Sequence, residues 1–218
     1  MSRMEIPTDW TFKSISVAEG FDRHVREQLP FYELVSGAVA HIARHYLRED
    51  GTYYDVGAST GNLSKLLQDT CQRRNVTVIG IDNSPQMRSL YDGYGSIEIA
   101  DCTNYPYRAF DVATLFLTLM FIPVEKRVPL LEELYENLRE GGALIVVDKE
   151  ESEGGYTGTI FRRLTLAGKV ATGTKAEEII TKELSLAGVQ RAITTDVFPV
   201  RPVEFFRYGE FVGWILEK

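Results

Sequence analysis

The sequence predicts an α/β fold: a mostly parallel sheet with helices on both faces and an antiparallel strand at its C-terminal end. Strand-like and helix-like segments alternate from residue 52 to residue 188, which is typical of parallel strands joined by crossover helices. The segment 109–119 is apolar almost throughout, as a strand covered on both faces must be. The chain ends in "FVGWILEK", a pattern that indicates a closing strand.

The composition fits one globular domain over residues 1–218, with 44% hydrophobic and 25% charged residues. A net charge of -7 disfavours nucleic-acid binding by broad electrostatics. The longest apolar stretch, "VATLFLTLMFIPV", is shorter than the ~20 residues that a membrane helix needs. The two cysteines, Cys71 and Cys102, are typical of reduced thiols. We therefore expect a cytoplasmic protein with no membrane partner, and the sequence leaves open whether it forms a homodimer.

The first half of the chain contains the elements from which the sheet begins. Apolar residues three and four apart predict a helix over 31–48, and residues 1–48 as a whole are expected to form an N-terminal helical cap. Ser84 followed by Pro85 is a good start for a helix. The remaining elements predicted here are strands at 52–57, 76–82 and 96–101, and helices at 61–74 and 84–94.

The second half continues the alternation and then departs from it. A helix is predicted over 124–140, kinked near Pro129 or beginning there, and closed by two glycines. Residues 152–186 are expected to form a variable helical insertion over the site. The elements predicted are a strand at 143–150, a loop at 152–160, helices at 161–171 and 176–188, and a closing hairpin of strands 193–200 and 211–218.

A glycine-bounded turn, "GASTG" at 57–61, follows the first strand, which ends near Asp55. A turn without bulky side chains lets a ligand lie against the backbone, and the amides of the following helix favour a carboxylate or phosphate. An ordinary strand-to-helix turn is the alternative. The dinucleotide fingerprint G-x-G-x-x-G is absent, because Ser59 and Thr60 replace glycine. Pyrophosphate binding is therefore not predicted.

Acidic residues also stand at the ends of the next two strands. Asp82 follows Gly61 by 21 positions, where an acid can accept hydrogen bonds from both ribose hydroxyls. A helix-capping role for Asp82 is the alternative, although Ser84 supplies a better cap. Asp101 can accept from an exocyclic amine, and Cys102 beside it is expected to be a small buried residue rather than a nucleophile. Because the carboxyl ends of parallel strands meet at one edge, these residues should share one site.

Together, the three strand ends resemble the class I S-adenosylmethionine-dependent methyltransferases, which have a Rossmann-like sheet. Within that superfamily the chain is most similar to the carboxy-S-adenosylmethionine synthases, enzymes of tRNA wobble-uridine modification. The stretches that carry this resemblance are "DWTF" followed by "VAEGFDRHVREQLPFY", then "YDVGASTGNLS", "IGIDNSPQM" and "EFFRYGEFVGWILEK".

The resemblance implies S-adenosyl-L-methionine as the cofactor. It also implies that an aromatic ring at position 32 lies over the cofactor. The residues expected to bind the cofactor are Tyr32, Asp55, Gly57, Ala58, Gly61, Asp82, Asn83, Met87, Asp101, Cys102 and Phe116.

Two departures from the family bear on its special reaction. Phe116 stands where the family has a polar amide, and Glu183 stands where the family has an arginine that clamps the extra carboxylate of its modified cofactor. An acid ~4 Å from that carboxylate would repel it by about 4 kcal/mol at an effective dielectric of ~20. We therefore expect plain S-adenosylmethionine to bind better, unless Arg162 or Arg163 restores the clamp.

The sequence favours methyl transfer to an acceptor that is a small molecule or belongs to a tRNA pathway. Such a reaction needs orientation and a dry pocket rather than a catalytic triad, and no catalytic residue is assigned. No metal site is predicted, because His24, His41 and His45 lack further ligands. The residues expected to face the acceptor are Tyr32, Arg162, Arg163, Arg207 and Tyr208.

Two other functions stay open. One is an enzyme of the carboxy-S-adenosylmethionine synthase type that uses prephenate. The other is a protein that binds S-adenosylmethionine without turnover. The chain also lacks the Asn/Asp-Pro-Pro-aromatic signature at the end of its fourth strand, which lowers the expectation of a nucleobase acceptor.

Overall fold

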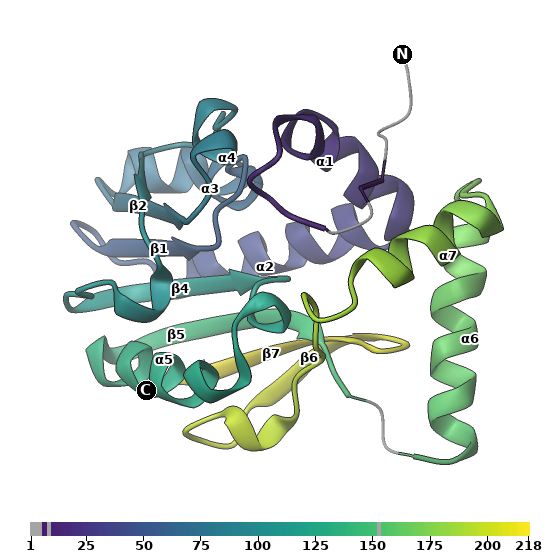
Figure 1. Ribbon diagram of the computed structural model, residues 1–218. Coiled ribbons are helices and arrows are strands. Elements are labelled where there is room, and N and C mark those ends of the chain that lie inside the picture. The colour runs from purple at the N-terminus through teal and green to yellow at the C-terminus, as the bar shows by residue number, and fades with distance from the viewer. Residues whose placement is uncertain (1–5, 8–9, 152–153) are drawn as a thin grey trace.

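Seven strands form a single sheet in the order β3-β2-β1-β4-β5-β7-β6 (Figure 1). The computed structural model describes residues 6–7, 10–151 and 154–218. Strands β1 to β5 pair in parallel, and β7 runs antiparallel to both β5 and β6. The chain moves outward from β1 to β3 and then returns to β4 beside β1. This is the Rossmann-like sheet of class I methyltransferases, and the predicted fold class is confirmed.

The bounds of the elements follow the predicted alternation closely. The strands are β1 (Thr52–Val56), β2 (Thr77–Asp82), β3 (Ser96–Ile99), β4 (Phe110–Phe116), β5 (Leu138–Lys149), β6 (Val203–Tyr208) and β7 (Phe211–Glu217). The helices are α1 (Ile15–Gln28), α2 (Tyr32–Tyr46), α3 (Asn62–Arg73), α4 (Pro85–Ser89), α5 (Val124–Asn137), α6 (Tyr156–Ala171) and α7 (Ala176–Ser185). Short 3-10 turns lie at Cys102–Asn104, Leu119–Phe121 and Thr195–Val197.

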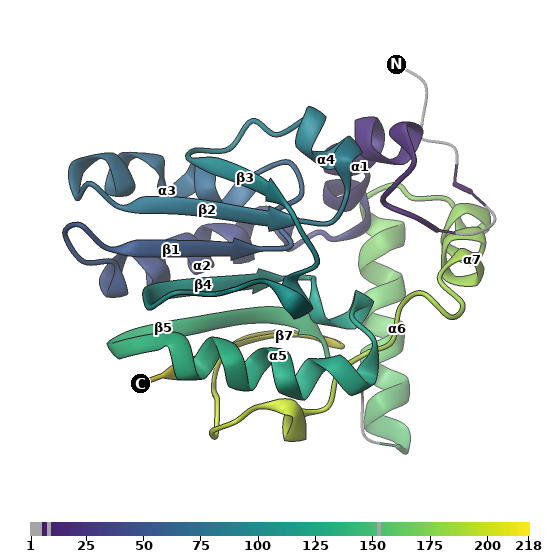
Figure 2. The same ribbon diagram turned by 60° about the vertical axis from the view of Figure 1, so that its left-hand side comes forward.

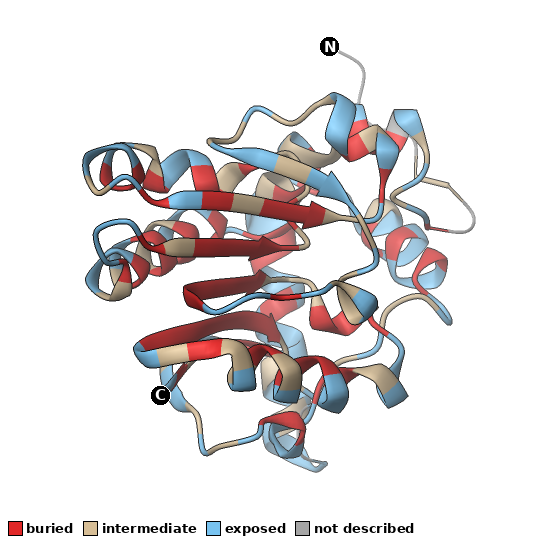
Figure 3. Cartoon of the chain, turned by 90° about the vertical axis from the view of Figure 1, so that its left-hand side faces the viewer, coloured by how far each residue is buried: buried red, intermediate tan, exposed pale blue. Residues whose placement is uncertain are grey.

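Helices cover both faces of the sheet (Figure 2). On one face, α2 and α3 bury apolar side chains such as Val35, Val39 and Leu67 against the strands. On the other face, α5 buries Leu131 and Leu134. The central strands are buried, whereas β3 at the edge is largely exposed (Figure 3). This sandwich leaves the carboxyl ends of the parallel strands as the place where side chains can converge.

Three helices, α1, α6 and α7, gather beyond those carboxyl ends (Figures 1 and 2). They belong to the predicted cap, 1–48, and the predicted insertion, 152–186. The other helix of the cap, α2, packs against the sheet face instead. Residues 1–5, 8–9 and 152–153 of these two segments lie outside the described residues. No helix in the described part of the chain is both long enough and apolar enough to span a membrane.

The closing hairpin is placed differently from the prediction. Residues 193–200 were expected to form a strand, but they contain a 3-10 turn, and the strand is β6. Pro199 and Pro202 lack the N–H groups that a paired strand would need. Val197 and Phe198 are nevertheless buried in the core. Their burial explains why the segment has the apolar pattern of a strand.

Three other boundaries also differ. Helix α5 begins at Val124 with Pro129 inside it and ends at Asn137, because Leu138 already pairs with β4. The glycine pair thus lies within β5 rather than after a helix. Helix α4 is shorter than predicted, and α6 begins at Tyr156, within the predicted loop.

Candidate functional site

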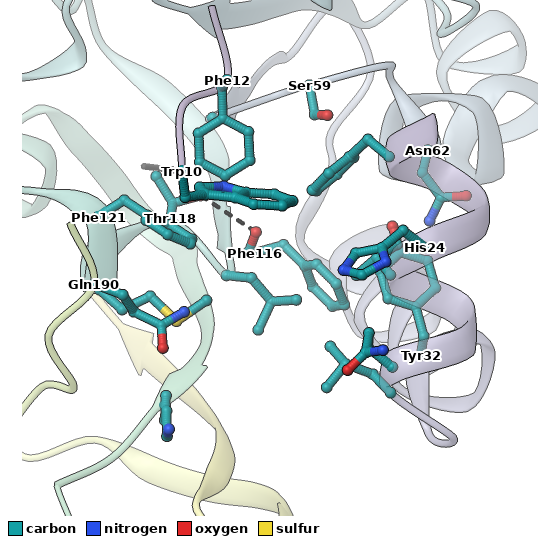
Figure 4. A pocket seen from close by; sticks show the side chains of 18 of the residues that line it. Trp10, Phe12, His24, Tyr32, Ser59, Asn62, Phe116, Thr118, Phe121 and Gln190 are labelled. Carbon is teal, nitrogen blue, oxygen red and sulfur yellow. Dashed lines mark hydrogen bonds between the residues drawn. The ribbon is translucent and has the colours of Figure 1, made fainter. Parts of the chain in front are cut away.

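A cavity of about 640 Å³ lies at the carboxyl ends of the parallel strands. One side consists of strand ends and the glycine turn, and the other consists of helices and the segment before α1 (Figure 4). We call the first side the sheet wall: Asp55, 57–60, 81–83 and 116–118. We call the second side the helix wall: Trp10, His24, Gln28, Arg162, Lys169 and Lys182.

The glycine turn is fixed by contacts within the protein. The N–H groups of Gly57 and Ala58 both donate to the Ile81 carbonyl, at 2.8 and 3.0 Å. Gly57 has a φ of +76°, and a Cβ there would lie 2.7 Å from Thr118 Cγ2. The glycine at 57 is therefore required by its backbone conformation and by Thr118, and a side chain there would meet the protein before any ligand.

Asp82 connects the turn to α4. Its Oδ2 accepts from the Ser59 N–H and its Oδ1 from the Ser84 N–H, both at 2.9 Å. Burial raises the pKa of Asp82, and these two amide bonds oppose the rise. The helix cap is Ser84, whose Oγ accepts from the Met87 N–H at 3.2 Å. Asp82 is half-buried at the cavity, so its oxygens retain acceptor capacity for a ligand.

Asp55 lies beneath the turn as a buried carboxyl group. The Thr114 hydroxyl donates to its Oδ1 at 3.1 Å, and the Tyr53 hydroxyl lies 2.7 Å from Thr114 Oγ1. Burial raises the pKa of Asp55 to about 7. The sheet wall thus carries a carboxyl group that is partly protonated at neutral pH.

The segment before α1 and α1 itself are tied to the sheet wall. The Thr60 hydroxyl donates to Asp22 Oδ1 at 2.7 Å, and Arg26 donates to Asn62 Oδ1 at 3.2 Å. The Ser84 hydroxyl donates to the Phe12 carbonyl at 2.6 Å. These bonds hold the N-terminal elements over the cavity.

Two lysines give the helix wall its charge. Lys169 Nζ lies 2.8 Å from Glu183 Oε1, and the two form an ion pair. Lys182 makes no ion pair with any described residue, and its amine lies against the Trp10 ring. Burial, and then the nearby Lys169, lower the pKa of Lys182 to about 6. A lysine that lines a cavity and has no ion-pair partner is suited to bind an anionic group.

Several buried polar atoms at the cavity have no hydrogen-bond partner among the described residues. They are Trp10 Nε1, His24 Nε2, Gln28 Oε1 and Asn62 Nδ2. Leaving such an atom unpaired costs about 1–3 kcal/mol. Figure 4 shows Trp10, His24 and Asn62 around the same space, with Phe116 between them. The cavity is therefore built to be filled by a polar ligand.

Comparison with known proteins identifies the family. A methyltransferase domain family matches residues 54–142, the part that holds the sheet wall. The carboxy-S-adenosyl-L-methionine synthase of Staphylococcus epidermidis is 34% identical, over 97% of this chain and 98% of the relative. The chain belongs to the carboxy-S-adenosyl-L-methionine synthase family. The resemblance predicted from the sequence motifs is confirmed.

Solved structures agree with this family at the level of the fold. The plantazolicin methyltransferase BpumL in complex with SAH has a TM-score of 0.57 at 15% identity, over 83% of this chain and 65% of that chain. A putative S-adenosyl-L-methionine-dependent methyltransferase from Methanococcus maripaludis has a TM-score of 0.57 at 15% identity, over 100% and 97%. This member of the synthase family is an S-adenosylmethionine-dependent transferase, and S-adenosylmethionine is its cofactor.

Most of the predicted cofactor residues lie at the cavity of this family member. Those that line it are Tyr32, Asp55, Gly57, Ala58, Asp82, Asn83, Met87, Cys102 and Phe116. Gly61 and Asp101 are not among the lining residues. Gly61 is the N-cap residue of α3, with a φ of +89°, and Asp101 is exposed and accepts from the Thr103 N–H at 2.9 Å. The cofactor contacts themselves stay a prediction.

Only some of the residues expected to face the acceptor lie at the cavity. Tyr32 and Arg162 line the cavity, whereas Arg163, Arg207 and Tyr208 do not. Arg207 is held by Glu150 and Glu204 beside a second cavity.

Tyr208 lies behind the site, where its ring packs against Phe31 at 5.1 Å. Cys102 lines the cavity, and burial raises the pKa of its thiol to about 12, which leaves it un-ionised and unsuited to act as a nucleophile.

Of the helix wall, the sequence predicted only Arg162. His24 was considered only as a metal ligand, and Trp10, Gln28, Lys169 and Lys182 were not singled out. The available signal was the spacing of His24 and Gln28, four residues apart among the apolar residues of one helix face. The described residues contain no group of three or more side chains that could hold a metal ion. His41 and His45 lie on an exposed face of α2.

Proposed function

We propose that this S-adenosylmethionine-dependent transferase forms and retains carboxy-S-adenosylmethionine, the activity printed in the name of its Staphylococcus epidermidis relative. The sequence alone favoured methyl transfer to an acceptor. The observation that supports the proposal is Lys182, a largely buried lysine that lines the cavity and has no ion pair among the described residues.

Glu183 no longer opposes a carboxylated cofactor. The expected repulsion depended on a free acid at this position. Burial would raise the pKa of Glu183, but the Lys169 ion pair outweighs it and holds that pKa below its usual value. The charge of Glu183 is balanced by Lys169, and Lys182 beside it supplies a second amine. A carboxylate on the transferred group would gain a charge-assisted hydrogen bond from Lys182.

The sheet wall fits the rest of the cofactor. Asp82 offers acceptor capacity where ribose hydroxyls are expected, and Asn62 has an unpaired buried Nδ2 beside the glycine turn. Tyr32 and Phe116 meet edge to face, with ring centroids 5.5 Å apart, and exclude water from the centre of the cavity. When bound, S-adenosylmethionine supplies a methyl carbon activated by its sulfonium. As the resemblance implies, prephenate is the carboxyl donor that we test.

Methyl transfer to a small acceptor is the second candidate. It is favoured by Phe116, which places an apolar ring where the family has a polar amide.

Mass spectrometry decides between the candidates. The purified protein is incubated with S-adenosylmethionine and prephenate, and the cofactor is analysed after denaturation. We expect a product heavier by one CO₂, and we expect Lys182→Met to lose it. Lys175→Met is the matched control, because Lys175 is exposed and outside the cavity. Appearance of S-adenosylhomocysteine without the carboxylated product would favour methyl transfer, and the absence of both would favour a binding protein.

A further inference from the structure

Three of the unpaired polar atoms lie together on the helix wall of the cavity. Trp10, His24 and Gln28 are 4%, 5% and 6% exposed, and Trp10 Nε1, His24 Nε2 and Gln28 Oε1 have no hydrogen-bond partner in the part of the chain that the structure describes. The Trp10 and His24 rings are in contact, with centroids 5.8 Å apart and an angle of 31° between their planes. Gln28 is anchored on its other side, where its Nε2 donates to Thr174 Oγ1 at 3.4 Å.

Helix α1 separates these atoms from the sheet wall. Asp22 and Arg26, four residues apart, face the glycine turn and α3 through Thr60 and Asn62. His24 and Gln28 are offset from that pair by two residues, which is about 200° around the helix axis. They face α6 and α7 instead. Lys169 and Lys182 are close enough to lower the pKa of His24, after burial, to about 4.

We propose that Trp10, His24 and Gln28 form a second ligand subsite, which binds the carboxyl-donating co-substrate rather than any part of S-adenosylmethionine. This inference rests on the proposed function and adds the residues that select the donor. The cofactor is expected on the sheet wall, where Asp82 and Asn62 are available. The three atoms on the opposite wall need a separate ligand, because buried polar groups are normally paired.

The chemistry of the three atoms defines the class of ligand. Trp10 Nε1 can only donate, Gln28 Oε1 can only accept, and a neutral imidazole can do either at Nε2. The amine of Lys182 lies against the Trp10 ring and adds a donor at the border of the subsite, which a bound carboxylate would keep protonated. A small carboxylate that also carries a hydroxyl group satisfies this set. The carboxylate accepts from the indole and the amine, and the hydroxyl donates to the amide.

The indole N–H provides a direct test in the intact protein. The chain has two tryptophans, and Trp214 is buried in β7, away from the cavity lining. The protein is labelled with ¹⁵N-tryptophan, saturated with S-adenosylhomocysteine, and titrated with prephenate. We expect the Trp10 indole signal to move and the Trp214 signal to stay. Trp214→Phe or Trp10→Phe, whichever folds, assigns the two signals.

Two further probes test the chemistry of the ligand. Phenylpyruvate, which lacks both the alcohol group and the ring carboxylate of prephenate, should bind at least tenfold more weakly than prephenate. Benzyl alcohol, which lacks the carboxylate, should leave the Trp10 signal unchanged. If S-adenosylhomocysteine alone shifts Trp10 and prephenate adds nothing, the residues belong to the cofactor site and the proposal is overturned.

Variants separate this proposal from the proposed function. His24→Phe and Gln28→Leu keep similar shapes and remove the polar atoms. We expect each to raise the KM for prephenate at least tenfold and to change the affinity for S-adenosylmethionine less than twofold, with His41→Phe as the exposed control. An equal loss of both affinities, or no change in KM, overturns the subsite. Prephenate binding at Trp10 without a carboxylated product would retain the subsite and reject the proposed function.

Discussion

The two walls of the cavity differ in how completely their polar groups are paired. On the sheet wall, Asp82 accepts two backbone N–H groups and Asp55 accepts the Thr114 hydroxyl. On the helix wall, Lys182 has no ion pair among the described residues and His24 Nε2 has no hydrogen bond. A wall whose polar groups are already hydrogen-bonded keeps its shape before the ligand binds. A wall with unsatisfied polar groups gains hydrogen bonds only when the ligand binds. We therefore expect the sheet wall to bind the cofactor and the helix wall to select the second substrate.

Asp82→Ala should have the largest effect, because it removes the carboxylate at the centre of the sheet wall. The variant loses charge-assisted hydrogen bonds to two ribose hydroxyls, each worth about 1.5–3 kcal/mol, and also frees the Ser59 and Ser84 amides. We expect the affinity for S-adenosylmethionine in calorimetry to fall at least ~100-fold.

Asp101→Ala is the matched control for Asp82→Ala, because Asp101 is an acid at the end of the neighbouring strand but lies outside the cavity lining. Its expected loss of affinity is under ~3-fold. Wild-type affinity in Asp82→Ala, or equal losses in the two variants, would contradict the placement of the ribose.

Lys182→Met should separate the two cofactors. Removal of the amine is expected to weaken carboxy-S-adenosylmethionine by about 1.5–3 kcal/mol, the value of a charged hydrogen bond, and to leave plain S-adenosylmethionine nearly unchanged. Calorimetry with both ligands measures the difference, and Lys175→Met serves as the exposed control. A similar loss for both ligands would place Lys182 in the cofactor site.

Binding of the carboxylated cofactor should take up a proton. The pKa of Lys182 is lowered to about 6 by burial and by Lys169, so its amine is mostly neutral at pH 7.5. A carboxylate beside it raises that pKa again. Calorimetry in buffers of different ionisation enthalpy should show uptake approaching one proton for carboxy-S-adenosylmethionine and much less for S-adenosylmethionine. Equal uptake for both would argue against a carboxylate at Lys182.

The free energy of unfolding should fall as the pH rises to neutrality, because Asp55 of the sheet wall loses its proton. The pKa of Asp55 is raised by burial to about 7 in the folded protein from 3.8. Its contribution to stability is therefore full below pH ~4 and is lost as pH rises through about 7. Asp55→Asn should reduce the loss between pH 5 and 8 by on the order of 2 kcal/mol in urea unfolding. The exposed Asp69→Asn should leave the loss unchanged; a wild-type pH profile in Asp55→Asn would reject this assignment.

Gly57→Ala should have the smallest effect. The new Cβ enters a positive-φ position and overlaps with Thr118, which we expect to cost about 1–2 kcal/mol of folding stability. Thr118→Ala in the same chain should recover part of that cost, and thermal unfolding of both single variants and the double variant measures the coupling. Strict additivity would mean that Thr118 is not what the side chain at 57 meets.

The order of strands and most of the sheet wall were predictable because their signals are local. The glycine turn, Asp82 and the Ser84-Pro85 helix start lie within 30 residues of one another, and each stands directly after or before its element. The hairpin was less predictable. Val197 and Phe198 are apolar because they are buried in the core, although they do not lie in a strand. In the sequence, the missing backbone N–H groups of the prolines are the only sign that this segment is not a strand.

The sequence by itself therefore determined the fold and the family, and it predicted the place of the cofactor. Tertiary structure alone decided the helix wall, where Trp10, His24 and Lys182 meet although they are far apart in the chain. It also decided the charge of that wall, because Glu183 was an unpaired acid in the sequence and is an ion-pair partner of Lys169 in the fold. The effect of a charge depends on its neighbours in space and on burial. Those neighbours come from α1, α6 and α7, whose packing no local pattern specifies.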